Sequence, residues 1–389
     1  MKFSIKFYFI LFLSRKNIFF KILKSRWEFN EPTQSDILVY DALPSISKDL
    51  QEILRSNTYQ FFYTRGEVLN IPILFKTLIT TGINKFRFNY KKKIIRSIDP
   101  KFVITQSDQD FNLYSLKKKY GGNFQVIVIQ KSVDLGPNFK EFVEKKKIHR
   151  NSIDYYFACG DATSKKLQRY LSGTKFFNSG CFRNNAYPGQ KHTDKKKVLF
   201  LSAWKPKFIF PEYEKEVLKL LEDYCKMRKL KLVISTRFSE TKYISEINKS
   251  LNYNNHKFEL RKNENSVYKS ICSYDLIVFC IQSIGYEALS RGKKVLCFPF
   301  AAKKYNQLDV IATNFMGKDN KRAEGKFWAN KFLKKKIFKK IDFVLNLNNI
   351  KWLKLLKKEF NNYVIYDKDN KLLIKKLKKI GIPLKSYLK

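Results

Sequence analysis

Short apolar runs recur along the first half of the chain, and each is bounded by turn residues. They have the length of buried strands, whereas the segments between them show helical spacing, as at 70–78 and 111–120. This alternation predicts a parallel sheet with helices on both faces. The predicted strands of this half are 35–41, 101–105, 123–130 and 153–158.

A polar, turn-rich stretch at 184–197 interrupts the pattern, and the alternation restarts at Val198. We therefore expect an α/β protein with two Rossmann-like lobes, a cleft between them and a Lys-rich helical C-terminal segment. In the second half the predicted strands are 198–202, 230–236, 275–281 and 294–298, and the predicted helices are 213–228, 266–273 and 284–291. The expected divisions are a basic aromatic segment 1–24, a first lobe 25–190, a second lobe 195–324 and helices 325–389 that pack back on the lobes.

Charge narrows the class of partner only slightly. The 389 residues include 78 Lys and Arg against 34 Asp and Glu, a net charge of +44 that favours anionic partners. The same chain is rich in Asn, Ile, Phe and Tyr, the composition that an AT-rich genome imposes, so the charge selects no partner by itself. Because basic residues are spread along the chain without a nucleic-acid motif, we expect no specific nucleic acid partner.

Cysteine and histidine spacing gives no sign of a metal site. The six cysteines contain no C-x-x-C pair and several lie in apolar runs, so we expect buried reduced thiols and a cytoplasmic protein. The three histidines are not spaced as metal ligands. Asp108-Gln109-Asp110 matches the D-x-D metal pattern of glycosyltransferase-A folds, but a second complete α/β lobe argues against that fold. We expect no cofactor and no required metal.

The first 24 residues allow two interpretations. The apolar run 7–13 is about a third of the roughly 20 residues that a spanning helix needs, and Lys and Arg flank it. The segment is either a basic aromatic helix at a membrane surface or an ordinary first helix packed on the first lobe. On the first interpretation the protein is peripheral on the inner face of the cytoplasmic membrane, with an anionic membrane surface as partner.

Residues 275–298 carry the clearest chemical pattern: strand, tight loop, short helix, glycine stop and strand. Ser283 can cap the helix, and Gly285 would let a ligand approach its first turn. Free N–H groups and the helix dipole then favour a phosphate, and Glu287 could accept hydrogen bonds from ribose hydroxyls. The alternative is a plain helix entry with an acidic residue favoured by the dipole.

Position along the predicted strands supplies the other candidates, because ligands of open α/β sheets bind at the carboxyl ends of strands. In the second lobe, Ser202 ends the first strand and Arg237 follows the second, where its guanidinium could clamp a diphosphate. In the first lobe, Asp108 is the candidate general base, with a turn aspartate as the alternative. The acceptor-binding candidates are Arg65, Glu67 and Gln130.

The segment G-Y-E-A-L-S-R-G-K-K-V at 285–295 resembles the signature of a family of surface-carbohydrate and O-antigen biosynthesis proteins. That family is similar to glycosyltransferase-B enzymes and to CDP-glycerol glycerophosphotransferases. The resemblance runs from about Trp27 to the C-terminus and implies a transferase that moves a glycosyl or polyol-phosphate group from a nucleotide-activated donor to a glycan or lipid-linked glycan acceptor. Supporting segments lie at 36–41, 64–70, 103–108, 126–130, 179–185, 198–204 and 325–328.

Two departures from the family pattern keep alternatives open. Relatives usually carry Asp-Ser-Thr or Asp-Ser-Ser before the glycine helix, where this chain has Ile281-Gln282-Ser283. After the strand that ends at Gln130, relatives usually have Asn-Gly or His-Gly, and here Lys131-Ser132 follows. A non-catalytic carbohydrate-pathway protein with a degenerate glycosyltransferase-B fold is therefore the alternative, and a nucleic-acid binder is a third class.

Overall fold

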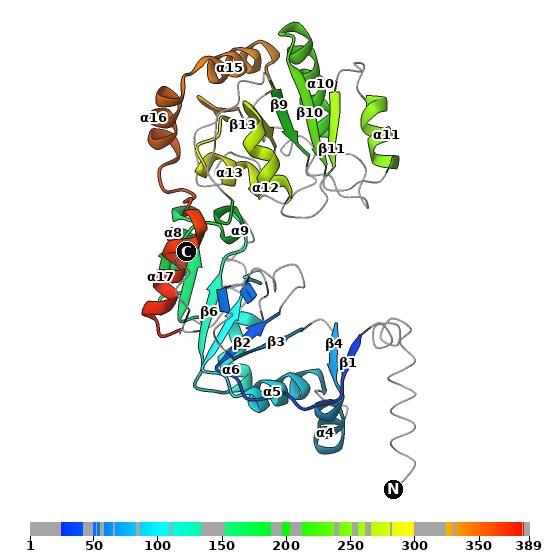
Figure 1. Ribbon diagram of the computed structural model, residues 1–389, viewed down its shortest axis with the longest axis vertical. Coiled ribbons are helices and arrows are strands. Elements are labelled where there is room, and N and C mark those ends of the chain that lie inside the picture. Colours follow the sequence, from blue (N-terminus) through cyan, green and yellow to red (C-terminus); the bar gives the residue numbers. More distant parts are fainter. Residues whose placement is uncertain are drawn as a thin grey trace.

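The structure is a computed structural model, and Figure 1 shows its two α/β lobes. It describes residues 25–41, 50–51, 53–54, 58–64, 67–82, 86–108, 110, 112–133, 152–187, 197–202, 212–236, 241–250, 256–260, 266–280, 282–298, 324–329, 332–382 and 384. The predicted segment 1–24 and most of the predicted linker 184–197 lie outside these residues.

The first lobe is built on a parallel sheet that, in the described residues, has six strands in the order β3-β2-β5-β6-β7-β8. A separate parallel pair joins β1 (Arg26–Glu28) to β4 (Val68–Asn70), and β4 leads directly into α4 (Ile71–Thr81). The strands of the sheet are β2 (Ile37–Tyr40), β3 (Tyr59–Phe62), β5 (Phe102–Thr105), β6 (Gln125–Ile129), β7 (Tyr155–Ala158) and β8 (Lys175–Asn178). The other helices described in this lobe are α5 (Phe86–Ile98), η1 (Leu113–Ser115), α6 (Leu116–Tyr120), α8 (Asp161–Gln168) and α9 (Phe182–Asn185).

The second lobe carries a sheet with the order β11-β10-β9-β12-β13-β15-β14, parallel except for the β14–β15 pair. Its strands are β9 (Lys197–Leu201), β10 (Lys231–Thr236), β11 (His256–Leu260), β12 (Leu276–Phe279), β13 (Val295–Cys297), β14 (Glu324–Gly325) and β15 (Trp328–Ala329). The helices described in this lobe before its C-terminal segment are α10 (Glu212–Met227), α11 (Thr241–Ser250), α12 (Ser266–Ser270), η2 (Ile271–Ser273) and α13 (Ser283–Ser290).

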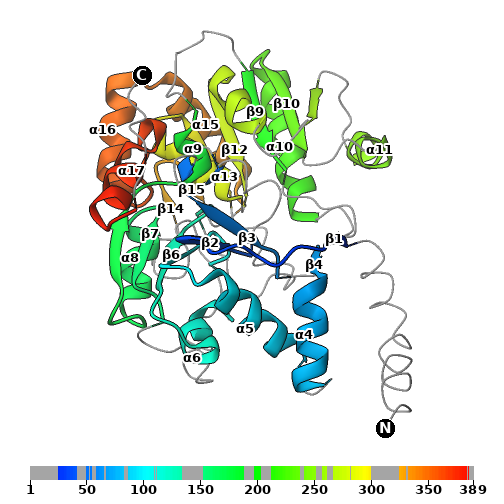
Figure 2. The same cartoon turned by 60° about the horizontal axis from the view of Figure 1, so that its bottom comes forward.

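Alternation along the strands divides the first lobe into two cores. Leu38 and Tyr40 face the core under α5 and α6, whereas Ile37 and Val39 face the opposite core. Both faces are apolar because a parallel sheet is covered by helices on both sides, and Figure 2 shows α5 and α6 on one side with α17 (Lys371–Lys379) on the other.

The C-terminal helices return from the second lobe to the first. Helices α15 (Lys334–Asn346) and α16 (Asn349–Phe360) place Ile341 and Trp352 in the second lobe's core. The chain then continues through η3 (Lys368–Asn370) into α17, which adds Leu373 to a first-lobe core. Figure 1 shows α16 beside the second lobe and α17 beside α8.

The predicted fold class is confirmed: two parallel α/β sheets follow one another, with helices at the C-terminus. Seven of the described strands were not predicted, namely β1, β3, β4, β8, β11, β14 and β15. All six cysteines are free, and five of them are buried. In the part of the chain that the structure describes, no helix is long and apolar enough to cross a bilayer.

Candidate functional site

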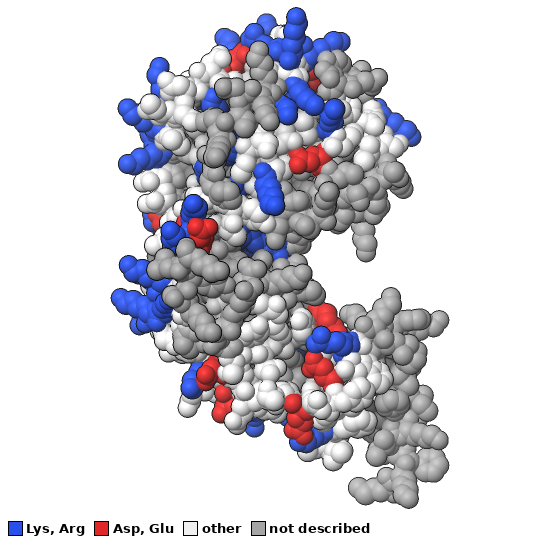
Figure 3. Space-filling model, viewed as in Figure 1, with Lys and Arg blue, Asp and Glu red and all other residues white. Residues whose placement is uncertain are grey.

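Helix α13 brings the predicted donor-binding segment to the junction of the lobes. The Asn184 side chain, from α9 of the first lobe, donates to the Ser290 hydroxyl (3.1 Å) and toward the Glu287 carbonyl (3.4 Å) of α13. Tyr187 stacks on Tyr268 of α12, with ring centroids 5.4 Å apart. A hollow between the two lobes is visible in the space-filling view of Figure 3.

Apolar packing also joins the lobes at α13. Val133, Cys159 and Cys181 follow strands of the first lobe, yet they belong to the core cluster that contains Ile284 and Tyr286 of α13. The carboxyl ends of first-lobe strands and the α13 segment therefore share one interface, the place where α/β sheets bind ligands.

The start of α13 differs from the predicted cap. Gln282 has extended backbone angles and occupies the N-cap position, and Ser283 is the first helical residue. The Gln282 side chain makes no cap hydrogen bond, and both of its amide atoms are buried without a partner. The helix start thus holds unsatisfied polar groups instead of a serine cap.

Gly285 has a packing role that the sequence did not reveal. A Cβ atom at this position would lie 2.3 Å from the Phe279 ring, so the absence of a side chain lets α13 pack on the end of β12. The ring of Phe279 also meets Tyr286 edge to face at 5.1 Å. On this side of α13, Phe279 occupies the space that we assigned to an approaching ligand.

Glu287 is fully buried, and neither carboxylate oxygen has a partner with hydrogen-bond geometry. Burial raises the pKa of this carboxyl from 4.5 to about 7, although Tyr268, the Val133 N–H, Arg183 and Arg291 lie near enough to lower it. An ionised carboxylate in such an environment is costly, and the raised pKa reflects this cost, because the protonated form carries no charge to solvate.

Asp108 lies just past the carboxyl end of β5 and is held by two tyrosines. The Tyr156 hydroxyl donates to its Oδ2 (3.0 Å), and the Tyr114 hydroxyl donates to its carbonyl (2.9 Å). Burial, followed by the Asp108 charge, raises the pKa of Tyr156 well above its ordinary value, so the hydroxyl stays protonated and remains a donor. Asp108 is half-buried, in keeping with a positioned carboxylate.

Asp41 is a candidate that the sequence analysis did not single out. It follows β2, has a left-handed backbone (φ 54°) and is almost fully buried. Its two carboxylate oxygens accept from the Thr64 hydroxyl (2.5 Å) and the Ser107 hydroxyl (2.6 Å). Gln106, after the neighbouring β5, is buried with both amide atoms unpartnered. The only sequence signal was the position of Asp41 at the end of the segment D-I-L-V-Y-D.

Two predicted ligand-binding side chains, Gln130 and Ser202, make internal hydrogen bonds. The amide of Gln130 donates to the Thr163 hydroxyl (2.9 Å) and accepts from the Cys159 N–H (2.7 Å), so it ties β6 to β7 and α8. The Ser202 hydroxyl donates to Glu214 of α10 (2.5 Å). Both side chains are buried, and in this conformation they stabilise the loops around the site.

The remaining candidates are not brought to the junction by any contact that we describe. Glu67 precedes β4, and its carbonyl accepts from the Arg26 N–H at the β1–β4 pair. Arg65 and Arg237 lie outside the described residues. Within the described ranges, no cluster of three or more His, Cys, Asp or Glu side chains could hold a metal ion.

Solved structures with the same arrangement of lobes belong to proteins of nucleotide-sugar and cell-wall metabolism. A "putative UDP-N-acetylglucosamine 2-epimerase" from Listeria monocytogenes aligns with a TM-score of 0.55 at 11% identity, over 89% of this chain and 96% of that one. MnaA of S. aureus, solved with UDP, aligns with a TM-score of 0.54 at 12% identity, over 90% of this chain and 98% of that one. The wall teichoic acid polymerase TagF with CDPG aligns with a TM-score of 0.50 at 11% identity, over 97% of this chain and 98% of that one. At such identities the likeness establishes the fold alone.

Two Rossmann-like lobes that meet at a helix after a second-lobe strand define a protein of the glycosyltransferase-B type. The profile of a family described as "putative O-antigen biosynthesis protein" matches residues 134–381, more than half of the chain. The chain therefore belongs to this O-antigen biosynthesis family. None of the curated proteins matches it.

Proposed function

We propose that this protein is a transferase of surface-polysaccharide or O-antigen biosynthesis. It moves a glycosyl or polyol-phosphate group from a nucleotide-activated donor to a glycan or lipid-linked glycan acceptor. Family membership and the fold set the pathway class. The structural relatives solved with UDP and with CDPG support a nucleotide-activated donor.

The buried and unpartnered carboxylate of Glu287 is the observation that carries the proposal. It lies in α13 at the junction of the lobes, where separation of α9 from α13 would expose it to a ligand. A carboxylate accepts two hydrogen bonds from the vicinal hydroxyls of ribose, which would satisfy both oxygens. The first turn of α13 then faces the phosphates with its N–H groups.

The reaction that we propose uses a first-lobe carboxylate as the base. Asp108, positioned by Tyr156, accepts the proton of the acceptor hydroxyl while that oxygen attacks the transferred group. The leaving group is a nucleoside diphosphate for a sugar and a nucleoside monophosphate for a polyol phosphate. The α13 dipole and Arg237 stabilise the charge that develops on it, so this mechanism requires no metal.

The rival proposal is a non-catalytic protein of the same pathway. Gln130 and Ser202 make internal contacts, and Gln282 leaves the helix start without a cap hydrogen bond. These observations fit a fold that binds a nucleotide or a partner without turnover. Nucleotide binding without group transfer is the result that would favour this rival.

Calorimetric titration with UDP, CDP, GDP and ADP tests the donor site. We expect saturable binding of at least one nucleotide and roughly tenfold weaker binding for Glu287→Gln, because a neutral amide loses charge-assisted hydrogen bonds. Glu222→Gln, which changes another buried glutamate on α10, is the matched control and should bind like the wild type. Absence of binding by every nucleotide would refute the donor site.

We also propose peripheral attachment to the inner face of the cytoplasmic membrane, through residues 3–23 and basic patches of the first lobe. A lipid-linked acceptor would be presented at that surface. The aromatic and basic composition of residues 1–24 supports this proposal, with Lys and Arg side chains reaching anionic headgroups. Deletion of 1–24 should weaken co-sedimentation with anionic vesicles, and equal binding by the truncated, folded protein would contradict it.

A further inference from the structure

Four large apolar side chains are exposed on two neighbouring elements of the first lobe. Trp27 of β1 and Phe29 just after it are 47% and 68% exposed, and Phe75 and Ile79 of α4 are 58% and 83% exposed. Trp27 and Phe29 are two positions apart with ring centroids 6.4 Å apart, and Phe75 and Ile79 lie one turn apart on the helix. We call these four residues the apolar surface.

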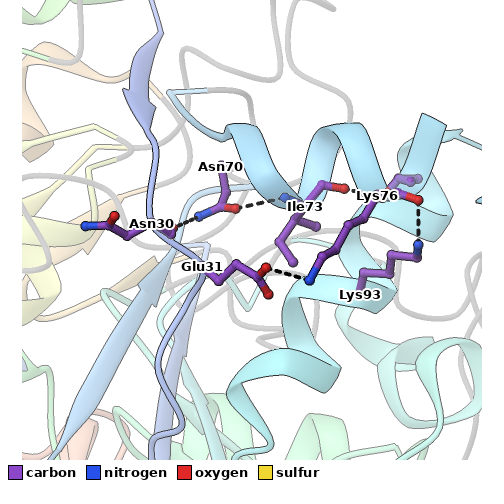
Figure 4. Close-up of polar contacts among 7 residues, drawn as sticks. Asn30, Glu31, Asn70, Ile73, Lys76 and Lys93 are labelled. Atoms are coloured by element: carbon purple, nitrogen blue, oxygen red, sulfur yellow. Dashed lines mark hydrogen bonds and ion pairs between the residues drawn. The ribbon is translucent and has the colours of Figure 1, made fainter. Parts of the chain in front are cut away.

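Hydrogen bonds tie the two elements of the apolar surface together. The Asn70 side chain donates to the Asn30 carbonyl (2.7 Å) and accepts from the Ile73 N–H (3.1 Å), as Figure 4 shows. The segment after β1 is thereby fixed to the first turn of α4, and Figures 1 and 2 both place β1 and β4 at the start of this helix. The apolar surface therefore belongs to one braced unit.

Helix α4 itself has an unusual composition for an outer helix. Lys76 is its one charged side chain among 11 residues, and the helix buries only Ile73 and Thr77. A surface helix normally shows polar residues on its outer face, so exposed Phe75 and Ile79 indicate a face that is covered in use.

The charges beside α4 favour an anionic partner. The acidic side chain of Glu31 is paired with Lys76 at 2.5 Å, and Glu28 is paired with Arg26 at 2.7 Å. Local negative charge is therefore largely cancelled.

Lys93 of α5 adds a positive charge that is not cancelled. Its ammonium donates to the Lys76 carbonyl (2.7 Å) and to the Thr80 hydroxyl (2.6 Å), both neutral acceptors (Figure 4). No carboxylate in the described residues lies within ion-pair distance of it. An ammonium held in this way beside an apolar helix can meet a phosphate headgroup.

The chain that enters β1 identifies the occupant. Residues 1–24 contain six Lys and Arg, no Asp or Glu, and seven aromatic residues, and they are covalently continuous with β1. A basic aromatic segment attached beside exposed Trp and Phe side chains matches the interfacial zone of an anionic bilayer.

We propose that the apolar surface docks on an anionic phospholipid bilayer, with Phe75 and Ile79 entering the acyl boundary and Lys93 on the headgroups. This inference rests on the proposed function for its purpose, because it would hold the lobes next to a lipid-linked acceptor. It assigns to α4 and β1 a contact that we first expected only of residues 3–23 and of basic patches.

Vesicle flotation of the full chain tests the docking. We expect Phe75→Ser with Ile79→Ser to lower the partition coefficient onto phosphatidylglycerol-containing vesicles roughly tenfold or more, because two large apolar side chains no longer insert. The matched control is Ile350→Ser with Leu353→Ser on α16, where the side chains are 68% and 50% exposed among lysines. The control should partition like the wild type. The proposal would be overturned if both double variants lost binding equally, or if neither lost any binding.

Further measurements separate the possible failures. Brominated lipids should quench Trp27 fluorescence, an effect that Trp27→Phe removes, and no difference between these two proteins would also overturn the docking. This readout does not depend on the α4 variant remaining folded.

If the α4 variant abolished self-association while vesicle binding was unchanged, a second copy of the chain would be the occupant and the proposal would be wrong. Nucleotide titration should be unaffected by the α4 variant, so loss of docking and failure of the donor site are distinguishable.

Discussion

The carboxyl of Glu287 combines complete burial with two oxygens that lack hydrogen-bond partners, and this combination sets its titration. The carboxyl lies in α13, at the point where this helix meets the first lobe. Burial raises its pKa to about 7. Sequence reasoning identified Glu287 from its place inside the helix, but it could not foresee the burial. That burial comes from residues far away in the chain, such as Val133 and Cys181.

The free energy of unfolding should fall as the pH rises from the pKa of Glu287 in the unfolded chain to its pKa in the folded protein. In the unfolded chain its carboxyl releases the proton near pH 4.5, whereas the folded protein holds it until about pH 7. The unfolded state therefore loses its proton first, and ionisation favours unfolding. The free energy of unfolding of Glu287→Gln, relative to that of the wild type, should rise by on the order of 3 kcal/mol between about pH 4 and pH 8. Urea unfolding at both pH values measures this, and a constant difference would contradict the assignment.

Gly285 provides a second test at the residue scale. Gly285→Ala places a methyl group against the Phe279 ring, so we expect a loss of about 1–3 kcal/mol of unfolding free energy from overpacking. Ser245→Ala, at an exposed position of α11, serves as the control and should change stability by less than about 0.5 kcal/mol. A neutral Gly285→Ala would mean that α13 is not packed on β12 as described.

The strands and helices were largely predictable because their patterns are local. The predicted strand 123–130 and the predicted amphipathic helix 213–228 appear as β6 and α10, within a few residues. The missed strands have weaker patterns: β3 is Tyr-Gln-Phe-Phe, and β11 contains His, Lys and Glu. Their place in the sheets is set by pairing with β2 and β10, a non-local effect that periodicity does not report.

Asn185 is a buried side chain that helps to hold the returning C-terminal chain on the first lobe. Its amide donates to the Ser179 carbonyl (2.8 Å) and to the Asn370 side chain (3.0 Å), and its Oδ1 accepts from the Asp367 N–H (2.9 Å). Asn185→Ala leaves these buried groups unsatisfied and should cost about 2–3 kcal/mol of unfolding free energy.

The control for this element is Asn123→Ala, in an exposed turn, which should be close to neutral. Limited proteolysis provides an independent readout, because a detached α17 should unfold and let trypsin cleave its backbone at lysines whose side chains are largely exposed already. An Asn185→Ala protein with unchanged stability and unchanged cleavage would show that the network does not hold the C-terminal chain.

At the level of the whole molecule, the two-lobed fold follows from the order of the elements, whereas the site follows from how the lobes meet. The segment S-G-C-F-R-N-N at 179–185 was visible as a family-like motif, and the structure places it between the lobes as α9 and its contacts. Asp41 and Gln106 follow the carboxyl ends of two adjacent strands, because β2 pairs with β5. No local sequence pattern encodes this pairing. The net charge of +44 is explained by neither the fold nor the site.

Group transfer tests the central claim most directly. The full-length protein is incubated with labelled nucleotide-activated sugars and CDP-glycerol, together with membranes that carry nascent glycan. The account predicts label in the glycan with equimolar release of the nucleotide, and loss of both with Asp108→Asn. A nucleotide that binds but is never released, with no label in the glycan for any donor, would contradict the transferase and leave the non-catalytic protein.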